Sequence, residues 1–189
     1  MSNFDCASSG GTFNGIGSDC ADTECAQPPD NDECEGMIEV FNGANIWDST
    51  DASNSADPPD EVACPYPFGG SYNDIWFTYT ATASGTLELN TCDSASIDTD
   101  LTVYTGTCGN LSLLDCNGDA SGMSGCQPYY SQLFLNVQEG DQLIIRIGGF
   151  GTGTAGPGTL DIGFDMPGAC CLDGSCQEDW DAAICVAIG

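Results

Sequence analysis

Short runs of β-branched and aromatic residues, with polar residues between them, fill the middle of the chain. The clearest run puts Ile75, Phe77 and Tyr79 on one face and Thr78 and Thr80 on the other, which is typical of a half-buried antiparallel strand. Clusters of Gly, Asn, Asp and Ser separate the runs, as turns require. Only residues 178–187 show a stretch with a helical period. The pattern predicts strands over residues 37–41, 74–82, 86–92, 101–104, 111–116, 132–137, 142–147 and 158–164.

These strands predict an all-β protein, a jelly-roll-like antiparallel β-sandwich over residues 34–166 with disulfide-rich N- and C-terminal extensions. The extensions are the cysteine-dense residues 1–25 and 167–189, and the polar, proline-bearing residues 26–33 read as a stiff linker. Trp76 falls on the polar face of its predicted strand. Either a loop or an extension covers it, or it is an exposed binding aromatic.

The charged residues of the chain are almost all acidic. Acidic residues number 29 against a single basic residue, Arg146, so the formal charge is −28, with no histidine. Such a chain cannot neutralise phosphates, and anionic lipid headgroups repel it, which excludes nucleic acid and membrane surfaces as partners. Its most apolar run, residues 143–147, is too short to insert into a membrane. Without histidine or lysine, Ser-His and Cys-His nucleophile pairs and Schiff bases are excluded, and we expect no enzymatic activity.

Cysteine usage indicates the compartment. Thirteen cysteines, together with 25 glycines and 9 prolines, are typical of a loop-rich protein stapled by disulfides that matures under oxidising conditions. We therefore expect an extracellular or cell-surface location. Residues 1–6 carry neither the basic nor the apolar part of a secretion signal, so either a leader is missing from this sequence or its start is artificial.

Six stretches of the central region follow one another in a fairly specific order: DIWFTYTA (74–81), GTL (85–87), TC (91–92), DTDLTVY (98–104), CNGD (116–119) and GDQLIIRIGG (140–149). Together they resemble the bacterial pre-peptidase C-terminal type of β-sandwich, over roughly the central two thirds of the chain. The resemblance implies a secreted accessory module, which occurs beside proteases and in large surface proteins. There it binds matrix or carbohydrate or serves as a spacer, and some members bind calcium.

Six cysteines lie inside the predicted sandwich: Cys34, Cys64, Cys92, Cys108, Cys116 and Cys126. We expect structural disulfides, because the chain has no histidine and no paired Cys-x-x-Cys motif for a zinc site. Other pairings are open, but the simplest one joins sequence neighbours. It pairs Cys34 with Cys64, Cys92 with Cys108, and Cys116 with Cys126.

The other seven cysteines lie in the two extensions: Cys6, Cys20 and Cys25, then Cys170, Cys171, Cys176 and Cys185. Residues 183–189 repeat the Cys-to-Gly spacing of residues 4–10. Joining residues 168–189 to residues 11–25 gives a composite that resembles a small repeat of secreted bacterial surface proteins, with a Cys-Cys-Leu-x-Asp-Gly-x-Cys head followed by Gly-Gly-Thr-Phe. Each half is too small to hold a core by itself.

This split has two interpretations. In one, the halves complete each other between neighbouring copies of the chain, with disulfides across the joint and with Phe13 and Trp180 as apolar contacts. In the other, the domain was trimmed from a longer protein of many repeats and the broken ends have no meaning. Cys6 is the odd cysteine, which either competes with Cys185 for one partner or pairs with it.

Carboxylates cluster at predicted strand ends, namely Asp98, Asp100, Asp115 and Asp119. Oxygen-rich loops of this kind suit calcium, although turn residues that only bind water show the same pattern. A third interpretation is an acidic surface adapted to high salt. Asn110, followed by Leu111 and Ser112, matches the glycan-acceptor motif.

Two functions follow from these observations. The preferred one is a structural subunit of an extracellular filament or surface layer, a head-to-tail homopolymer joined through the cysteine-rich ends. The alternative is a secreted, calcium-dependent module that binds carbohydrate or matrix, with the split repeat closed within one chain. Its binding aromatics would come from Trp47, Trp76, Tyr66, Tyr129 and Tyr130.

Overall fold

The computed structural model of the chain describes residues 27–55, 64, 70–92, 97–120, 126, 128–165, 168–172 and 175–180. Strands form nearly all of its regular structure, and the described part contains one 3₁₀ turn, η1 (Cys34–Gly36). The strands are β1 (Ile38–Glu39), β2 (Gly43–Asp48), β3 (Tyr72–Thr80), β4 (Gly85–Asn90), β5 (Thr99–Thr107), β6 (Asn110–Asn117), β7 (Gln132–Val137), β8 (Gln142–Gly149), β9 (Pro157–Asp165), β10 (Gly168–Leu172) and β11 (Ser175–Trp180).

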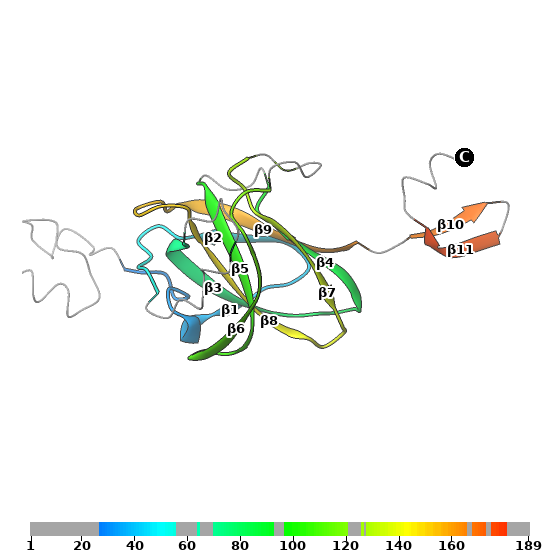
Figure 1. Ribbon diagram of the computed structural model, residues 1–189, viewed down its shortest axis with the longest axis horizontal. Coiled ribbons are helices and arrows are strands. Elements are labelled where there is room, and N and C mark those ends of the chain that lie inside the picture. The colour runs from blue at the N-terminus through cyan, green and yellow to red at the C-terminus, as the bar shows by residue number, and fades with distance from the viewer. Residues whose placement is uncertain are drawn as a thin grey trace, which may run out of the picture.

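Two sheets pack face to face as a sandwich (Figure 1). One sheet has the order β1-β3-β8-β5-β6 and the other has the order β2-β9-β4-β7. Neighbouring strands are antiparallel except β1, which runs parallel to β3 with Ile38 opposite Phe77. The predicted jelly-roll-like antiparallel β-sandwich is therefore confirmed, with one parallel pair at an edge. β10 and β11 form a separate antiparallel hairpin.

Two parts of the strand pattern differ from the sequence prediction. β2 gave no period-2 signal, because Trp47 enters the core while the adjacent Ile46 is 87% exposed. Glu178 opens the stretch predicted as a helix, but β11 extends to Trp180, since pairing with β10 outweighs a weak helical period. The rest of that stretch lies outside the described residues.

The main core lies between the two sheets and takes alternate residues of β3, β4, β5, β7, β8 and β9, together with Trp47 of β2. Ile75, Phe77 and Tyr79 all point into it, as their alternation predicted. The core is completed by Leu101, Val103, Leu143, Ile145 and Ile147 of the five-stranded sheet and by Trp47, Leu87, Leu89, Leu133, Leu135, Val137, Leu160 and Ile162 of the other sheet.

A second, smaller cluster lies on the outer face of the five-stranded sheet. Trp76 is 0% exposed there and stacks on Tyr104, with 5.8 Å between ring centroids. Cys34 of η1 and Ile144 of β8 complete the buried cluster, and Met37, Cys108, Leu111 and Leu113 pack against it. A loop therefore covers Trp76, and this side chain is not an exposed aromatic.

Three disulfides join cysteines of the sandwich, and the predicted pairing of sequence neighbours is wrong. The bonds are Cys34–Cys108, Cys64–Cys116 and Cys92–Cys126. The bonded cysteines come from segments that are adjacent in the fold but distant in the sequence. Cys108 lies in the β5–β6 turn beneath η1, and β4, which precedes Cys92, pairs with β7, which follows Cys126.

The sandwich begins earlier than residue 34. Asn31 is buried, and its side-chain amide and backbone oxygen both bind the backbone of Trp76, at 3.0 and 2.8 Å. Asp32 is buried beside it. These two residues of the predicted linker 26–33 therefore pack on the body, because the outer face of the sheet is apolar at Trp76 and needs a cover.

The cysteine-rich extensions are described only in part. Cys170, Cys171 and Cys176 lie on the β10–β11 hairpin, where Cys171 is opposite Cys176, and Trp180 ends β11. The other predicted inter-subunit residues lie outside the described residues, namely Cys6, Phe13, Cys20, Cys25 and Cys185. Within the described ranges, no helix has the length and apolar character needed to cross a bilayer.

Candidate functional site

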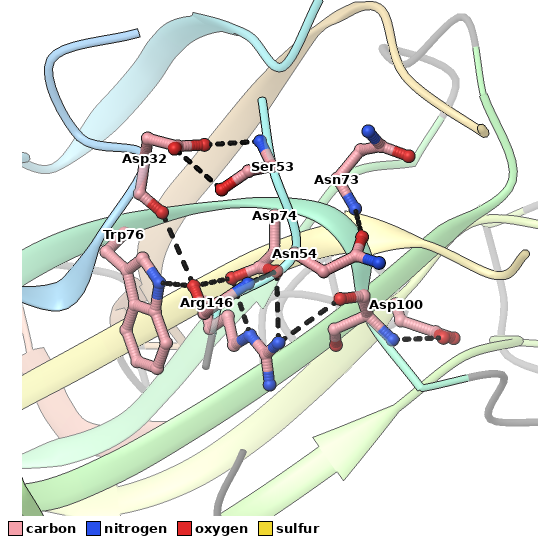
Figure 2. Close-up of polar contacts among 10 residues, drawn as sticks. Asp32, Ser53, Asn54, Asn73, Asp74, Trp76, Asp100 and Arg146 are labelled. Atoms are coloured by element: carbon pink, nitrogen blue, oxygen red, sulfur yellow. Dashed lines mark hydrogen bonds and ion pairs between the residues drawn. The ribbon is translucent and has the colours of Figure 1, made fainter. Parts of the chain in front are cut away.

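A buried ion pair lies on the outer face of the five-stranded sheet (Figure 2). Arg146 stands between Trp76 of β3 and Thr102 of β5 in the sheet register. Its Nε donates to Asp74 Oδ2 at 2.8 Å and its Nη2 donates to Asp74 Oδ1 at 3.0 Å. Its guanidinium carbon lies 5.2 Å from the centre of the Trp76 ring. The only basic residue of the chain is therefore used inside the protein and not on its surface.

Hydrogen bonds extend from this pair to the segments that cover it. The Ser55 hydroxyl donates to Asp74 and accepts the Trp76 indole N–H at 2.6 Å. Asp32 accepts bonds from the backbone N–H and the hydroxyl of Ser53, at 2.6 and 2.8 Å (Figure 2). Together these bonds fasten two loops, at residues 31–32 and 53–55, over the indole.

A second buried carboxylate holds the chain where it enters β3. Asp100 Oδ2 accepts the backbone N–H groups of Gly70 and Ser71, at 2.9 and 3.2 Å, and the Ser71 carbonyl accepts a bond from Arg146. Ser71 has φ near +49°, a left-handed conformation that only surrounding contacts maintain. Gly148 lies opposite Asp100, and a Cβ there would come within 2.6 Å of Ser71. Sheet and loop are thus in backbone contact at this point.

This network is structural rather than catalytic. Asp74, Asp100, Trp76 and Arg146 are all buried, so no substrate reaches them. A guanidinium stays protonated at all physiological pH values and cannot act as a base. What the arrangement does is neutralise a buried carboxylate and hold the cover of the sheet in one geometry.

The structure brings part of the predicted calcium cluster together. Burial raises the pKa of Asp98 to about 6, with further contributions from the negative charges of Asp119 and Asp100. Asp98 Oδ1 is buried and has no hydrogen-bond partner in the described part of the chain. Asp119 is half-buried, and its Oδ1 accepts the Tyr129 N–H at 2.6 Å. Asp98 and Asp119 therefore form the core of this cluster.

The other two predicted ligands have different surroundings. Asp100 has one oxygen committed to two backbone N–H groups, and Asp115 is exposed on β6, where its carboxylate accepts the Cys116 N–H. Over the described residues, no three acidic or cysteine side chains are arranged to hold a metal ion. The strand predicted at residues 111–116 ended one residue after Asp115, whereas β6 continues to Asn117, so Asp115 lies within the strand and not in a loop at its end.

The predicted binding aromatics are mostly buried. Trp47 lies in the core, and its ring fills the space over Gly158, where a Cβ would come within 2.3 Å of the indole. Trp76 is covered, and Tyr66 lies outside the described residues. Tyr130 is half-buried, whereas Tyr129 is 63% exposed and has φ near +78°. Tyr129 is therefore the one exposed candidate in the described part of the chain.

Asn110, the predicted glycan acceptor, lies at the start of β6. It follows Gly109 (φ near +76°) in the turn from β5 and is exposed to solvent. Its position is accessible, as a glycan would require.

A groove at the β1–β2 edge was not foreseen from the sequence. β1 ends one sheet and β2 ends the other, and the apolar side chains of Ile38, Phe41 and Ile46 are exposed there. Two pockets of about 290 and 660 Å³ lie along this edge. The strand predicted at residues 37–41 contains β1, which is limited to Ile38–Glu39, and nothing in its pattern showed that it lies at an open edge.

The chain was compared with protein families, curated proteins and solved structures. No family model and no curated protein matches the sequence. The pre-peptidase C-terminal domain of a collagenase from Bacillus anthracis is similar in structure, with 8% identity, a TM-score of 0.41, and coverage of 67% of this chain and 94% of that domain. CorA, a surface-associated copper-binding protein of Methylomicrobium album BG8, has 10% identity, a TM-score of 0.41, and coverage of 68% and 98%.

Proposed function

We propose that the chain is a structural subunit of an extracellular filament or surface layer, assembled head to tail through its two cysteine-rich extensions. The observation that supports the proposal is that the first described residues, before β1, and the end of β9 lie at opposite poles of the sandwich. The three disulfides fit an extracellular or cell-surface location, since such bonds persist under oxidising conditions.

The described segment before β1 and the end of β9 lie at opposite poles of the sandwich. We define the first pole by the start of β3 and the end of β8 (Tyr72, Gly149), and the second pole by the other ends of these strands (Thr80, Gln142). The segment before β1 packs toward the first pole, where Asp32 binds Ser53. β9 is antiparallel to β2 and β4, and it ends at the second pole, toward β10 (Figure 1).

This geometry favours joining between copies. A strand of nine residues is roughly 30 Å long, so closure of the split repeat within one chain requires the extensions to run back along the sandwich. Joining the second pole of one copy to the first pole of the next requires no such return. An interface between two different surfaces of the same chain propagates as an open filament unless its rotation closes a ring.

Charge opposes this association, because copies that each carry −28 repel one another. Covalent and buried contacts at the joint are therefore needed. In this proposal the seven cysteines of the extensions supply the covalent contacts: Cys6, Cys20, Cys25, Cys170, Cys171, Cys176 and Cys185. In this proposal Phe13 and Trp180 supply the apolar part.

Assembly of the purified full-length chain tests the proposal. Without reductant and with calcium present, we expect a ladder of covalent oligomers on non-reducing gels and filaments in electron micrographs. Deletion of residues 1–25 should leave a folded monomer, whereas a variant with Cys92→Ser and Cys126→Ser retains both extensions and should still assemble. A full-length chain that stays monomeric on gels and by light scattering contradicts the proposal.

A second candidate function is calcium-dependent binding of carbohydrate or matrix. It is favoured by the buried, unpartnered Oδ1 of Asp98 beside Asp119, with the exposed Tyr129 next to them. Carboxylate oxygens are suitable calcium ligands, and waters and backbone carbonyls can complete the six to eight that calcium takes. Calcium titration calorimetry should show binding that Asp98→Asn abolishes and Asp115→Asn retains. No heat of binding in the unsubstituted chain excludes this candidate.

A further inference from the structure

The β1–β2 edge is the open side of the sandwich. β1 pairs only with β3, and β2 pairs only with β9, so each strand has one edge with no neighbouring strand in the described part of the chain. Exposed edges are the places where proteins accept a further strand from another segment. At the opposite edge, β6 and β7 lie in contact with each other.

Two pockets follow each other along this edge and share Glu39 and Val40 in their walls. The pocket of about 290 Å³ reaches the core through Trp47, Ile75 and Phe77. The pocket of about 660 Å³ lies against Phe41, Tyr79 and Ala81, together with Glu139, Gly140 and others. Along β3 and just beyond it, the combined wall extends from Ile75 to Thr82, the length of an eight-residue strand.

The chemistry of the groove specifies its occupant. Its floor is apolar, while Glu39, Asp48 and Glu139 put only negative charge on its walls. An acidic segment is therefore repelled, and a segment with apolar side chains at alternate positions fits the floor. Few parts of so acidic a chain satisfy both conditions.

Residues 182–189, which lie outside the described residues, satisfy both conditions. Their sequence, AAICVAIG, contains no charged side chain, and Ile184, Val186 and Ile188 occupy alternate positions. Two of these three side chains are isoleucine and one is valine, types that favour strands. Residues 6–18 are also uncharged, but they are rich in Gly and Ser and lack the alternation.

We propose that the β1–β2 groove binds residues 182–189 of a second copy of the chain, as an extended segment laid over the two pockets. Backbone pairing with it is confined to residues 38–40, because the N–H and the carbonyl of Phe41 already bind the Asn45 side chain. The inference rests on the proposed head-to-tail function and names the contact that joins the copies. Ile184, Val186 and Ile188 face the groove, so Cys185 faces away from it. Asn31 lines the groove six residues after Cys25, so the joint brings the two cysteine-rich extensions of different copies together.

Photo-crosslinking in the full-length chain tests this contact directly. Benzoyl-phenylalanine replaces Ile38, which is 47% exposed, and chains with normal and heavy nitrogen are mixed before irradiation. We expect crosslinks from position 38 to residues 181–189 of the other isotope, identified by mass spectrometry. The matched control replaces Leu114, also 47% exposed but on β6, and should not give this product. Crosslinks within one chain, crosslinks to residues 1–26, or no crosslink overturn the inference.

Substitutions provide a second measurement, which tests the groove contact separately from the proposed filament function. Ile38→Asp and Val186→Asp should each raise the subunit concentration at half assembly by at least about tenfold, because each loses the burial of an apolar side chain. Leu114→Asp and Ala187→Asp, on the opposite edge and the opposite strand face, should leave it unchanged. If Ile38→Asp and Val186→Asp still form filaments as the unsubstituted chain does, the groove contact is contradicted but the proposed filament function is not. A full-length chain that stays monomeric contradicts the filament. If a synthetic peptide of residues 182–189 still crosslinks at position 38 of that monomer, the result supports the groove contact alone.

Discussion

Arg146 and Asp74 meet at two points inside the protein, with Nε 2.8 Å from Oδ2 and Nη2 3.0 Å from Oδ1. Both side chains are buried, and the Ser55 hydroxyl and Trp76 indole continue the contact. Once such a pair is out of water, removing one partner leaves an uncompensated charge, whereas removing both often costs little. The pair therefore fixes the cover of the sheet more than it adds net stability.

Arg146→Met should lower the free energy of unfolding by about 3–5 kcal/mol, because Asp74 is then left as an unpaired buried charge. Urea unfolding followed by circular dichroism measures this loss. The double variant Arg146→Met with Asp74→Leu should recover much of it. Asp115→Asn, an exposed control on β6, should change stability by less than about 0.5 kcal/mol. A loss below about 1 kcal/mol in the single variant contradicts the structural role.

Loss of the Cys34–Cys108 disulfide should loosen the cover over Trp76. Replacing both cysteines by serine removes a bond with a sequence separation of 74, and chain entropy predicts a loss of about 4 kcal/mol. Acrylamide, a neutral quencher, should then quench tryptophan fluorescence more strongly at native conditions.

The control for this prediction is Cys92→Ser with Cys126→Ser. That bond has a separation of 34 and joins loops at the first pole, so its loss should cost a similar free energy without exposing the indole. Equal quenching in both variants would contradict the assignment of η1 as the cover of Trp76.

Stability should fall as pH rises through the Asp98 titration. The folded pKa, about 6, lies above the ordinary value of 3.8, so the protonated form is favoured in the folded state and its stabilisation is lost between about pH 4 and pH 6. Asp98→Asn should therefore raise the melting temperature above pH 6 and leave it unchanged below pH 4. A gain independent of pH, measured by calorimetry at several pH values, argues against a raised pKa.

Bound calcium would make the charged Asp98 carboxylate stabilising, the opposite of its effect in the metal-free protein. If calcium binds at Asp98 and Asp119, chelation removes a ligand specific to the native state and lowers the melting temperature, and Asp98→Asn abolishes this response. Scanning calorimetry with and without EDTA, at fixed ionic strength, measures the difference. An unchanged melting temperature in EDTA excludes a calcium role in stability, and sodium chloride alone should not replace calcium.

Local alternation was enough to predict most of the sandwich. The alternation of Ile75, Phe77 and Tyr79 predicts a strand, because its period of two reflects one buried face. β2 was missed because it contributes Trp47 to the core while Ile46 points to solvent. A strand that forms an edge has one weakly constrained face, and its pattern is correspondingly weak.

Features that depend on tertiary pairing could not be predicted. The partner of Cys34 is set by η1 packing over the β5–β6 turn, a contact across more than 70 positions of sequence. Arg146 lies in the middle of an apolar run, and the sequence of this run does not show that Asp74 lies on the neighbouring strand, β3. The groove also depends on sheet order, since only the topology shows that β1 and β2 stand at open edges.

Burial of Arg146 leaves the surface without a basic side chain, and in a filament this has a polyelectrolyte consequence. Each whole chain carries 28 net negative charges, so a head-to-tail array with one chain for every roughly 30 Å of sandwich length would carry on the order of one charge per ångström. Duplex DNA carries one per ~1.7 Å and holds a condensed layer of counterions. Even at twice the subunit spacing, the proposed filament would gather cations along its length as nucleic acid does.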